Sequence, residues 1–408
     1  MMNARALLTW SPFLFFLIFL CLFPLVSPLL AEGNYQASAL SSWRRTKETF
    51  DMFIRMPSSM TAREFCDSIP ADKDVVLDRE DVLDHIFRNH RHVIMAIEML
   101  QGNTNAARAA IRILKYVRGE WRQIVGESLG ELIRVNPVAF LNACYEERED
   151  LHIKEEGFPV GFIPDIMKKH ERSSYELGIR MEALQAVEDV KLESVRDECL
   201  KGLKGKHEEL GLEIRSCARH EEKPIYDQKE RISLVFMEML RIPCRENMKR
   251  VLDLISEDRK YNFDHIIPLI FPQLMAGDTL SDPFYLILRE ARCGNEYAID
   301  VLFRLGFYVI GLPSMEFCGM ASNLILIKPT LFIDKLAKHR HRLGSRVSLD
   351  DLDHICNYIS NWDYPEETDV NLILRRRIDA LASLNIPEHK ELINHCIKLI
   401  TTQLKKMI

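Results

Sequence analysis

The feature that most constrains this chain is an internal repeat. Residues 102–140 and residues 294–332 align without a gap, always 192 positions apart. Over these 39 residues, average residue frequencies would give roughly two or three identities by chance. Eleven are found: Gly102, Asn103, Ala106, Arg112, Tyr116, Val117, Gly119, Leu132, Ile133, Pro137 and Phe140 match Gly294, Asn295, Ala298, Arg304, Tyr308, Val309, Gly311, Leu324, Ile325, Pro329 and Phe332. A repeat of this kind predicts an array that stacks like units.

The repeated residues are mostly helix punctuation and apolar helix faces. Gly102 and Asn103 are suited to ending one helix and capping the next. Gly119 predicts a break, and Asn136 followed by Pro137 predicts another helix start, because proline is tolerated in a first helical turn. The block therefore predicts the order helix, glycine break, helix, proline start, helix.

Arginine is the exception among the repeated residue types. Arg112 and Arg304 each fall in the middle of a predicted helix, and we interpret them as surface or inter-helix hydrogen-bonding residues rather than functional ones. The longest basic run, Arg375-Arg376-Arg377, is interpreted as a solvated helix face. The formal net charge is −6 with both signs mixed along the chain, and nucleic-acid binding, which needs a clustered basic face, is therefore not expected.

Apolar residues recur with helical spacing along most of the chain, and no stretch alternates with period two for long enough to predict a strand. The sequence therefore predicts an all-α protein. The clearest expected helices cover residues 43–56, 78–87, 106–117, 124–135, 175–187, 192–203, 230–240, 248–255, 283–293, 370–384 and 387–407.

One helix pair carries a resemblance to a known architecture. The stretch Met181-Glu182-Ala183-Leu184-Gln185-Ala186-Val187 resembles one unit of a HEAT or armadillo repeat, in which an Ala- and Leu-rich helix pairs with a second helix across a short turn. The resemblance is to the architecture, covers residues 175–206 and identifies no particular family. It implies an armadillo- or HEAT-like α-solenoid, or a stacked helical bundle, in two related halves.

Composition shifts divide the chain into four segments. We expect a signal peptide over residues 1–31, a partly helical approach segment over 32–72, an N-terminal helical-repeat half over 73–215 and a C-terminal helical-repeat half over 216–408. The boundary between the halves is placed where residues 204–223 become rich in Lys, Glu and His before Pro224.

The N-terminus reads as a secretory signal. A short cationic start precedes the almost wholly apolar residues 10–31, and Pro24 and Pro28 break the stretch near its exit. Ala31 is the expected cleavage site, and a periplasmic or secreted protein follows. The alternative is an uncleaved membrane anchor formed by residues 10–31, because about 20 apolar residues can span a bilayer.

Cleavage at Ala31 would leave nine cysteines, an odd number, so at least one must stay free or pair with another molecule. They are scattered singly and include no C-x-x-C motif, so neither a zinc cluster nor a thioredoxin-like site is indicated. We expect most of them to be buried thiols.

No catalytic, cofactor-binding or metal-binding residue is predicted. The sequence has no G-x-S-x-G elbow, P-loop or G-x-G-x-x-G motif. The histidine groups do not have zinc-ligand spacing on one helix face; they are His85, His90 and His92, then His339 and His341, then His389 and His395.

The function expected is therefore that of an exported, non-enzymatic helical-repeat scaffold that binds a protein or peptide partner. Trp362 and Tyr364, two aromatic residues in one loop, are the expected partner-contact patch. The alternative is a helical enzyme or metal-binding protein with a site in the cleft between the halves. A contact between one of the histidines His85, His90 and His92 and a histidine or carboxylate of the second half would favour that alternative.

Overall fold

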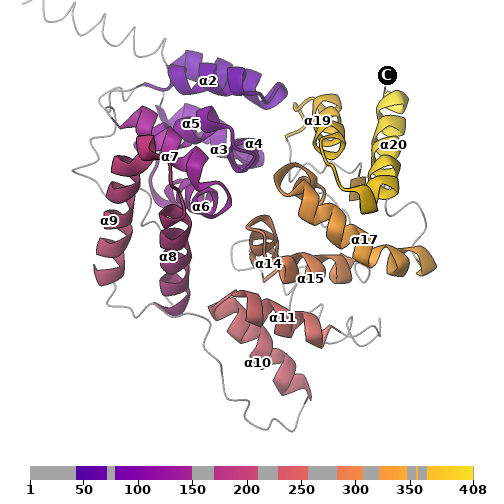
Figure 1. The fold of residues 1–408 in the computed structure, drawn as a ribbon. Helices are drawn as coiled ribbons and strands as arrows, with labels where there is room; N and C mark the ends of the chain where they lie inside the picture. Colours follow the sequence, from indigo (N-terminus) through magenta and orange to yellow (C-terminus); the bar gives the residue numbers. More distant parts are fainter. Residues whose placement is uncertain are drawn as a thin grey trace, which may run out of the picture.

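A computed structural model describes residues 43–70, 79–148, 170–209, 228–255, 283–306, 321–346, 355–356 and 365–407. Every regular element in these ranges is a helix, and none of these residues lies in a strand. The all-α prediction is confirmed (Figure 1). We call residues 43–209 the first region and residues 228–407 the second region.

The first region begins with a helix over residues 43–55. It continues with α2 Ser59–Ser68, α3 Arg79–Phe87, the 3-10 turn η1 Arg88–His90, α4 Val93–Leu100, α5 Thr104–Leu114, α6 Gly119–Val135, α7 Pro137–Glu147, α8 His170–Gln185, η3 Val190–Leu192 and α9 Glu193–Glu209. The second region contains α10 Gln228–Arg241, α11 Arg245–Leu254, α14 Pro283–Arg292, α15 Glu296–Gly306, a helix over residues 321–327, α17 Pro329–Arg346, α19 Val370–Ala382, η5 Pro387–His389 and α20 Lys390–Met407.

The buried apolar side chains form two clusters that follow this division. One cluster runs from Trp43 to Leu203 and also takes in Ile373 of α19. The other runs from Ile232 to Leu404. Residues 43–70, expected to form an approach segment, contribute Trp43 and Phe65 to the first cluster, so they pack into the same core as α3–α9.

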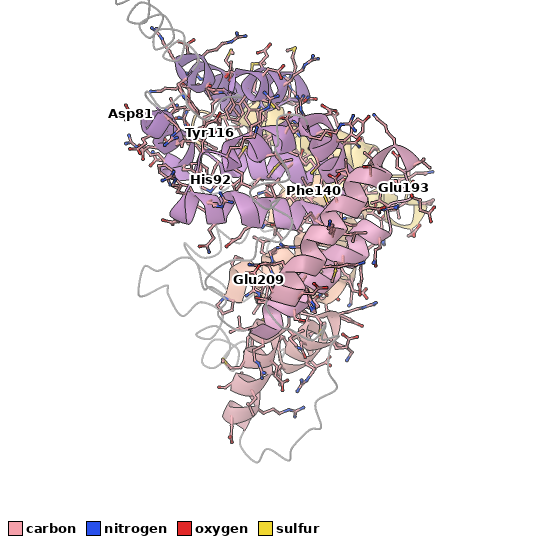
Figure 2. The ribbon with its side chains drawn as sticks, turned by 90° about the vertical axis from the view of Figure 1, so that its left-hand side faces the viewer. Asp81, His92, Tyr116, Phe140, Glu193 and Glu209 are labelled. Atoms are coloured by element: carbon pink, nitrogen blue, oxygen red, sulfur yellow. The ribbon has the colours of Figure 1, made fainter. Side chains whose placement is uncertain are left out.

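Helix α5 lies at the centre of the first cluster. Its buried positions are mostly alanines, which allow α2 and α7 to approach it closely on either side. In the pair α8 and α9, α8 packs against α6 and α9 against α7. Helix α9 runs from Glu193 to Glu209 in the direction of the second region (Figure 2). Helices α19 and α20 form a comparable pair that packs beside α17 (Figure 1).

The repeated glycines make the same turn twice. Gly102 and Gly294 have φ angles of 92° and 91°, in the left-handed region that favours glycine. After each glycine, the amide of Asn103 or Asn295 donates to the carbonyl of Glu98 or Glu290, at 3.0 and 2.9 Å. The amides of Gly102 and Gly294 donate to the carbonyls of Met99 and Ala291. This is the Schellman arrangement that ends a helix, and the predicted helix stop is confirmed in both copies.

Asn103 also caps α5, because its side chain accepts the Ala106 amide at 3.3 Å. The predicted start at Pro137 is confirmed too, with Asn136 accepting the Ala139 amide at 3.0 Å. The predicted break before the next helix is confirmed, because α5 ends at Leu114 and Gly119 has a positive φ. The predicted start of that helix at Ile124 is wrong, since α6 begins at Gly119 itself. The φ angle of 55° at Gly119 turns the chain directly into the helix.

The repeated arginines form hydrogen bonds between helices, as predicted. Arg112 donates from Nη1 to the carbonyl of Cys66 at 2.9 Å, near the end of α2. Arg304 donates to the carbonyls of Leu252 and Ile255, both at 3.1 Å, at the end of α11. Each arginine therefore satisfies carbonyls that the last turn of a neighbouring helix leaves open.

We expect Gly102→Ala to destabilise the first region by roughly 1–2 kcal/mol, because a Cβ disfavours positive φ. A Cβ at Gly102 would also lie 2.9 Å from Asn136 Nδ2, whereas at Gly294 the nearest such atom is Lys328 Cε at 3.9 Å. Gly294→Ala should therefore cost less than Gly102→Ala. Urea unfolding followed by circular dichroism measures both.

Gly205 provides the matched control, because it lies within α9 and a Cβ there meets nothing within 4 Å. Gly205→Ala should stabilise the protein by roughly 0.5–1 kcal/mol. Equal midpoints for Gly102→Ala and Gly205→Ala would show that the turn does not require glycine.

Candidate functional site at the junction of the two regions

Charged side chains of α6 and α8 in the first region pair with charged side chains of α14 in the second. These side chains are buried or largely buried, although Lys, Glu and Arg rarely are unless they are paired. We call this set the junction cluster; its members are Glu127, Glu131, Arg134, Arg172, Glu176, Arg180, Arg289, Glu290 and Arg292.

The strongest contact of the junction cluster joins Arg134 to Glu290. The two guanidinium Nη atoms donate to the two carboxylate oxygens at 2.8 and 2.9 Å, in the bidentate geometry that is typical of strong charge-assisted pairs. The side chain of Glu290 is only 1% exposed. Glu176 of α8 lies beside this pair, 3.5 Å from Arg134, and it also accepts from Arg289 of α14.

A second pair crosses the junction. Arg292 lies 2.7 Å from Glu131 through Nε and 2.9 Å through Nη2. Within the first region, Arg180 lies 3.9 Å from Glu176 and packs over Gly130. A Cβ at Gly130 would lie 2.3 Å from Arg180 Nη2, so the guanidinium of Arg180 would have to shift if α6 carried any other residue there.

The protonation of the junction cluster follows from its burial and its arginines. Burial alone would raise the pKa of Glu176, but Arg289, Arg134 and Arg180 lower it to about 2. Burial lowers the pKa of Arg180 to about 10. Burial raises the pKa of Glu127 against the 3.0 Å hydrogen bond from Gln123, which lowers it. Glu176 is therefore firmly ionised, whereas the charged form of Glu127 is disfavoured.

Further polar contacts join the two regions around α19. Arg376 donates to Glu98 and Gln101 of α4, Arg91 lies 3.7 Å from Glu367, and the Asp369 amide donates to the Arg55 carbonyl at 2.9 Å. Glu98 and Glu290 occupy equivalent places before the two Schellman turns, and each binds an arginine of the other region.

The solvated face predicted for Arg375-Arg376-Arg377 is wrong for two of the three residues. Only Arg375 is exposed. Arg377 is fully buried and donates to the Ser322 hydroxyl at 2.6 Å and to the Cys356 carbonyl at 3.2 Å. The run straddles two helix faces, because consecutive helical residues point about 100° apart.

The histidines that could have marked a metal or catalytic site are dispersed. His85 contacts Asp51 at 2.8 Å within the first region, and Arg91 lies against both of them. His339 contacts Asp300 at 2.8 Å, and His389 contacts Asp334 at 3.2 Å. Nothing is described of the side chains of His90 and His341. Among the described residues, no three His, Cys, Asp or Glu side chains are arranged to hold a metal ion.

The thiols are mostly buried, as the sequence analysis expected. The described cysteines that are not disulfide-bonded are Cys66, Cys144, Cys199, Cys356 and Cys396, all buried, and the partly buried Cys293. Burial raises the pKa of the Cys66 thiol to about 12, so this thiol is not poised as a nucleophile. Cys244 is disulfide-bonded.

Two buried ion-pair clusters occupy equivalent places with opposite charges. In the first region, Arg108 of α5 binds Glu147 of α7 at 2.7 Å and Glu146 at 3.2 Å. In the second region, 192 positions on, Asp300 of α15 binds His339 of α17 and Lys338, at 2.8 and 2.9 Å. In the first region the positive charge is Arg108 on α5, the earlier of the two helices. In the second region it is Lys338 on α17, the later of the two helices. Burial alone would raise the pKa of Asp300, but its hydrogen bonds from His339, Lys335 and Lys338 hold it well below its usual range.

The predicted cleavage site Ala31 and the predicted contact residues Trp362 and Tyr364 lie outside the described residues. The junction cluster was not predicted. A signal for it is present, because Arg172, Glu176 and Arg180 recur every four residues and so share one face of α8. Such a row is also typical of an exposed helix face, and sequence alone does not separate the two cases.

Comparison of the chain with known protein families, with characterised proteins and with solved structures finds no significant match. The helices described here include none with the length and apolar character needed to cross a membrane. The junction cluster therefore has to be interpreted from its own geometry.

Glu176→Gln should destabilise the protein by about 3 kcal/mol, because it leaves Arg289 and Arg134 with a neutral partner in a buried site. The folded-state pKa of Glu176 is about 2, against an ordinary 4.5. Its stabilisation is thus complete above pH 4.5 and is lost as pH falls from about 4.5 to about 2. Urea unfolding at pH 6 and at pH 3 should show a smaller acid-induced loss for the variant than for wild type.

Glu48→Gln is the control, because Glu48 forms an exposed pair with Arg44, with side chains 62% and 83% exposed. Such a pair contributes at most about 0.5 kcal/mol, so little change is expected. A Glu176→Gln variant with the acid sensitivity of wild type would contradict the ionised, structural role of Glu176.

Proposed function

We propose that this protein is an exported, non-enzymatic scaffold that binds a protein or peptide partner through stacked helices of the armadillo or HEAT kind. The observation that carries the proposal is the charge reversal between Arg108–Glu146 and Asp300–Lys338. A catalytic or metal site needs particular residue types, whereas a structural joint needs only opposite charges that meet. We therefore interpret the ion-pair clusters around Arg108 and Asp300 as contacts that hold neighbouring helices together.

Matching segments beyond the sequence repeat support an array of two related units. Residues 45–69 match 231–255 at a spacing of 186, with Arg45, Phe50, Arg55, Pro57, Asp67 and Ile69 identical to Arg231, Phe236, Arg241, Pro243, Asp253 and Ile255. Residues 177–201 match 374–398 at a spacing of 197, with Leu177, Arg180, Ala183, Leu184, Cys199 and Lys201 identical to Leu374, Arg377, Ala380, Leu381, Cys396 and Lys398. Equivalent helices in these segments have equivalent neighbours, such as α2 against α5 and α11 against α15.

The buried arginines follow the same correspondence. Arg180 packs over Gly130, and Arg377 binds Ser322, which lies 192 positions after Gly130. Stacked units of this type expose long helical surfaces that bind extended partners. We propose a duplicated unit that begins near residue 43 in the first copy and near residue 229 in the second.

Exposed apolar side chains support a partner surface on the first helix pair of each unit. Met52 on the helix over 43–55, Met56 directly after that helix and Met60 on α2 are 46%, 61% and 70% exposed. Leu234 and Met237 are 43% and 46% exposed on α10. Methionine is flexible and polarisable, and it suits surfaces that adapt to a partner.

Export to the periplasm or the medium is proposed from the apolar N-terminus, and the Cys244 disulfide supports an oxidising compartment. N-terminal sequencing of the exported protein should begin at Glu32, directly after Ala31. Recovery of a chain that still carries residues 1–31 would favour the membrane-anchored alternative.

The triple variant Met52→Ser, Met56→Ser and Met60→Ser should weaken partner capture at least tenfold, because each loses its apolar contact area. Capture is measured with the mature protein immobilised and an envelope extract as prey. Val190→Ser is the control, since Val190 is 81% exposed on η3, away from this surface.

Circular dichroism must show that both variants stay folded. A partner that both variants retain equally would exclude this surface. Hydrolysis or transfer of any envelope component by the purified protein would instead favour the enzymatic alternative.

A further inference from the structure

We propose that the junction cluster binds a small oxyanion, a phosphate or a carboxylate, with Arg172 as its principal ligand. Arg172 lies on α8 and is 7% exposed. Within the described residues its guanidinium forms no ion pair or hydrogen bond, and its buried Nε has no partner. A buried charge without a partner is costly, and proteins rarely keep one unless something binds it.

The charge balance around Arg172 favours an anion. The junction cluster holds five arginines and four glutamates. Three of the glutamates pair with an arginine: Glu290 with Arg134, Glu131 with Arg292, and Glu176 with Arg289. Glu127 is the remaining carboxylate, and burial raises its pKa. Arg180 shares Glu176 with Arg289, at 3.9 Å, so among the described residues Arg172 is the arginine of the junction cluster that contacts no carboxylate.

The electrostatics of Arg172 point the same way. Burial and the neighbouring charge of Arg289 lower its pKa to about 9. An anion bound at Arg172 would offset both effects, because it supplies hydrogen-bond acceptors and a negative charge. The planar guanidinium fork matches two oxygens of a phosphate or a carboxylate, and Arg is the residue that recognises such groups best.

The competing explanation is structural: Arg172 could pair with Glu127, which is close enough to affect its pKa. The two explanations differ in what substitutions do. If Arg172 is an anion ligand with no internal partner, Arg172→Gln removes a buried uncompensated charge and should leave stability unchanged or raised. If it pairs with Glu127, both Arg172→Gln and Glu127→Gln should destabilise the protein.

The experiment uses the mature full chain and follows thermal unfolding while inorganic phosphate or acetate is titrated at constant ionic strength with chloride. At ten times the dissociation constant, the bound anion should raise the Tm by roughly 2–4 °C. A rise with phosphate alone identifies a phosphate-type ligand, and a rise with acetate alone identifies a carboxylate. The Tm rise should vanish in Arg172→Gln.

Two further variants complete the test. Glu127→Gln should leave the Tm rise in place, because the anion binds Arg172 and not Glu127. Arg375→Gln should respond as wild type does, since Arg375 is an exposed arginine on α19. No rise with either anion, or the same rise in Arg172→Gln as in wild type, overturns the proposal.

Discussion

The bidentate pair between Arg134 and Glu290 is the contact on which the arrangement of the two regions depends. Glu290 is also the residue whose carbonyl accepts the Asn295 amide in the second Schellman turn. Its backbone thus ends α14 while its side chain holds α6 of the other region. Glu98 repeats this double role in the first region, where its partner is Arg376. Helix termination and the joining of the regions are therefore coupled through the same residues.

This coupling makes the junction sensitive to charge. Removing one partner of a buried pair leaves the other without compensation, at a cost of about 3–5 kcal/mol. Asp51, Glu176 and Asp300 are held ionised by cationic neighbours and have lowered pKa values. Each lies where helices meet: Asp51 against His85, Glu176 against α14 and Asp300 against α17. Acid therefore weakens contacts between helices before it affects the apolar clusters.

The sequence predicted the helices, the turns at Gly102 and Gly294, and the linking roles of Arg112 and Arg304. These features depend on residue types with one strong local preference, such as glycine at positive φ or proline in a first turn. The armadillo- or HEAT-like stacking stays a prediction. The junction cluster could not be predicted, because a charged row such as Arg172, Glu176 and Arg180 looks the same on a solvated helix as on a buried one. Only the neighbouring elements, α14 and Gly130, decide that it is buried.

The reversed charges of the two helix joints also affect how a chain with an internal repeat folds. Two similar units in one polypeptide can exchange helices during folding, and misassembly of this kind is characteristic of repeat proteins. If α5 packed on α17, Arg108 would face Lys338; if α15 packed on α7, Asp300 would face Glu146 and Glu147. Like charges would meet in both exchanged pairings, and opposite charges meet only in the native ones. The opposite polarity of the copies thus gives each helix a means of distinguishing its own partner from that partner's counterpart in the other copy.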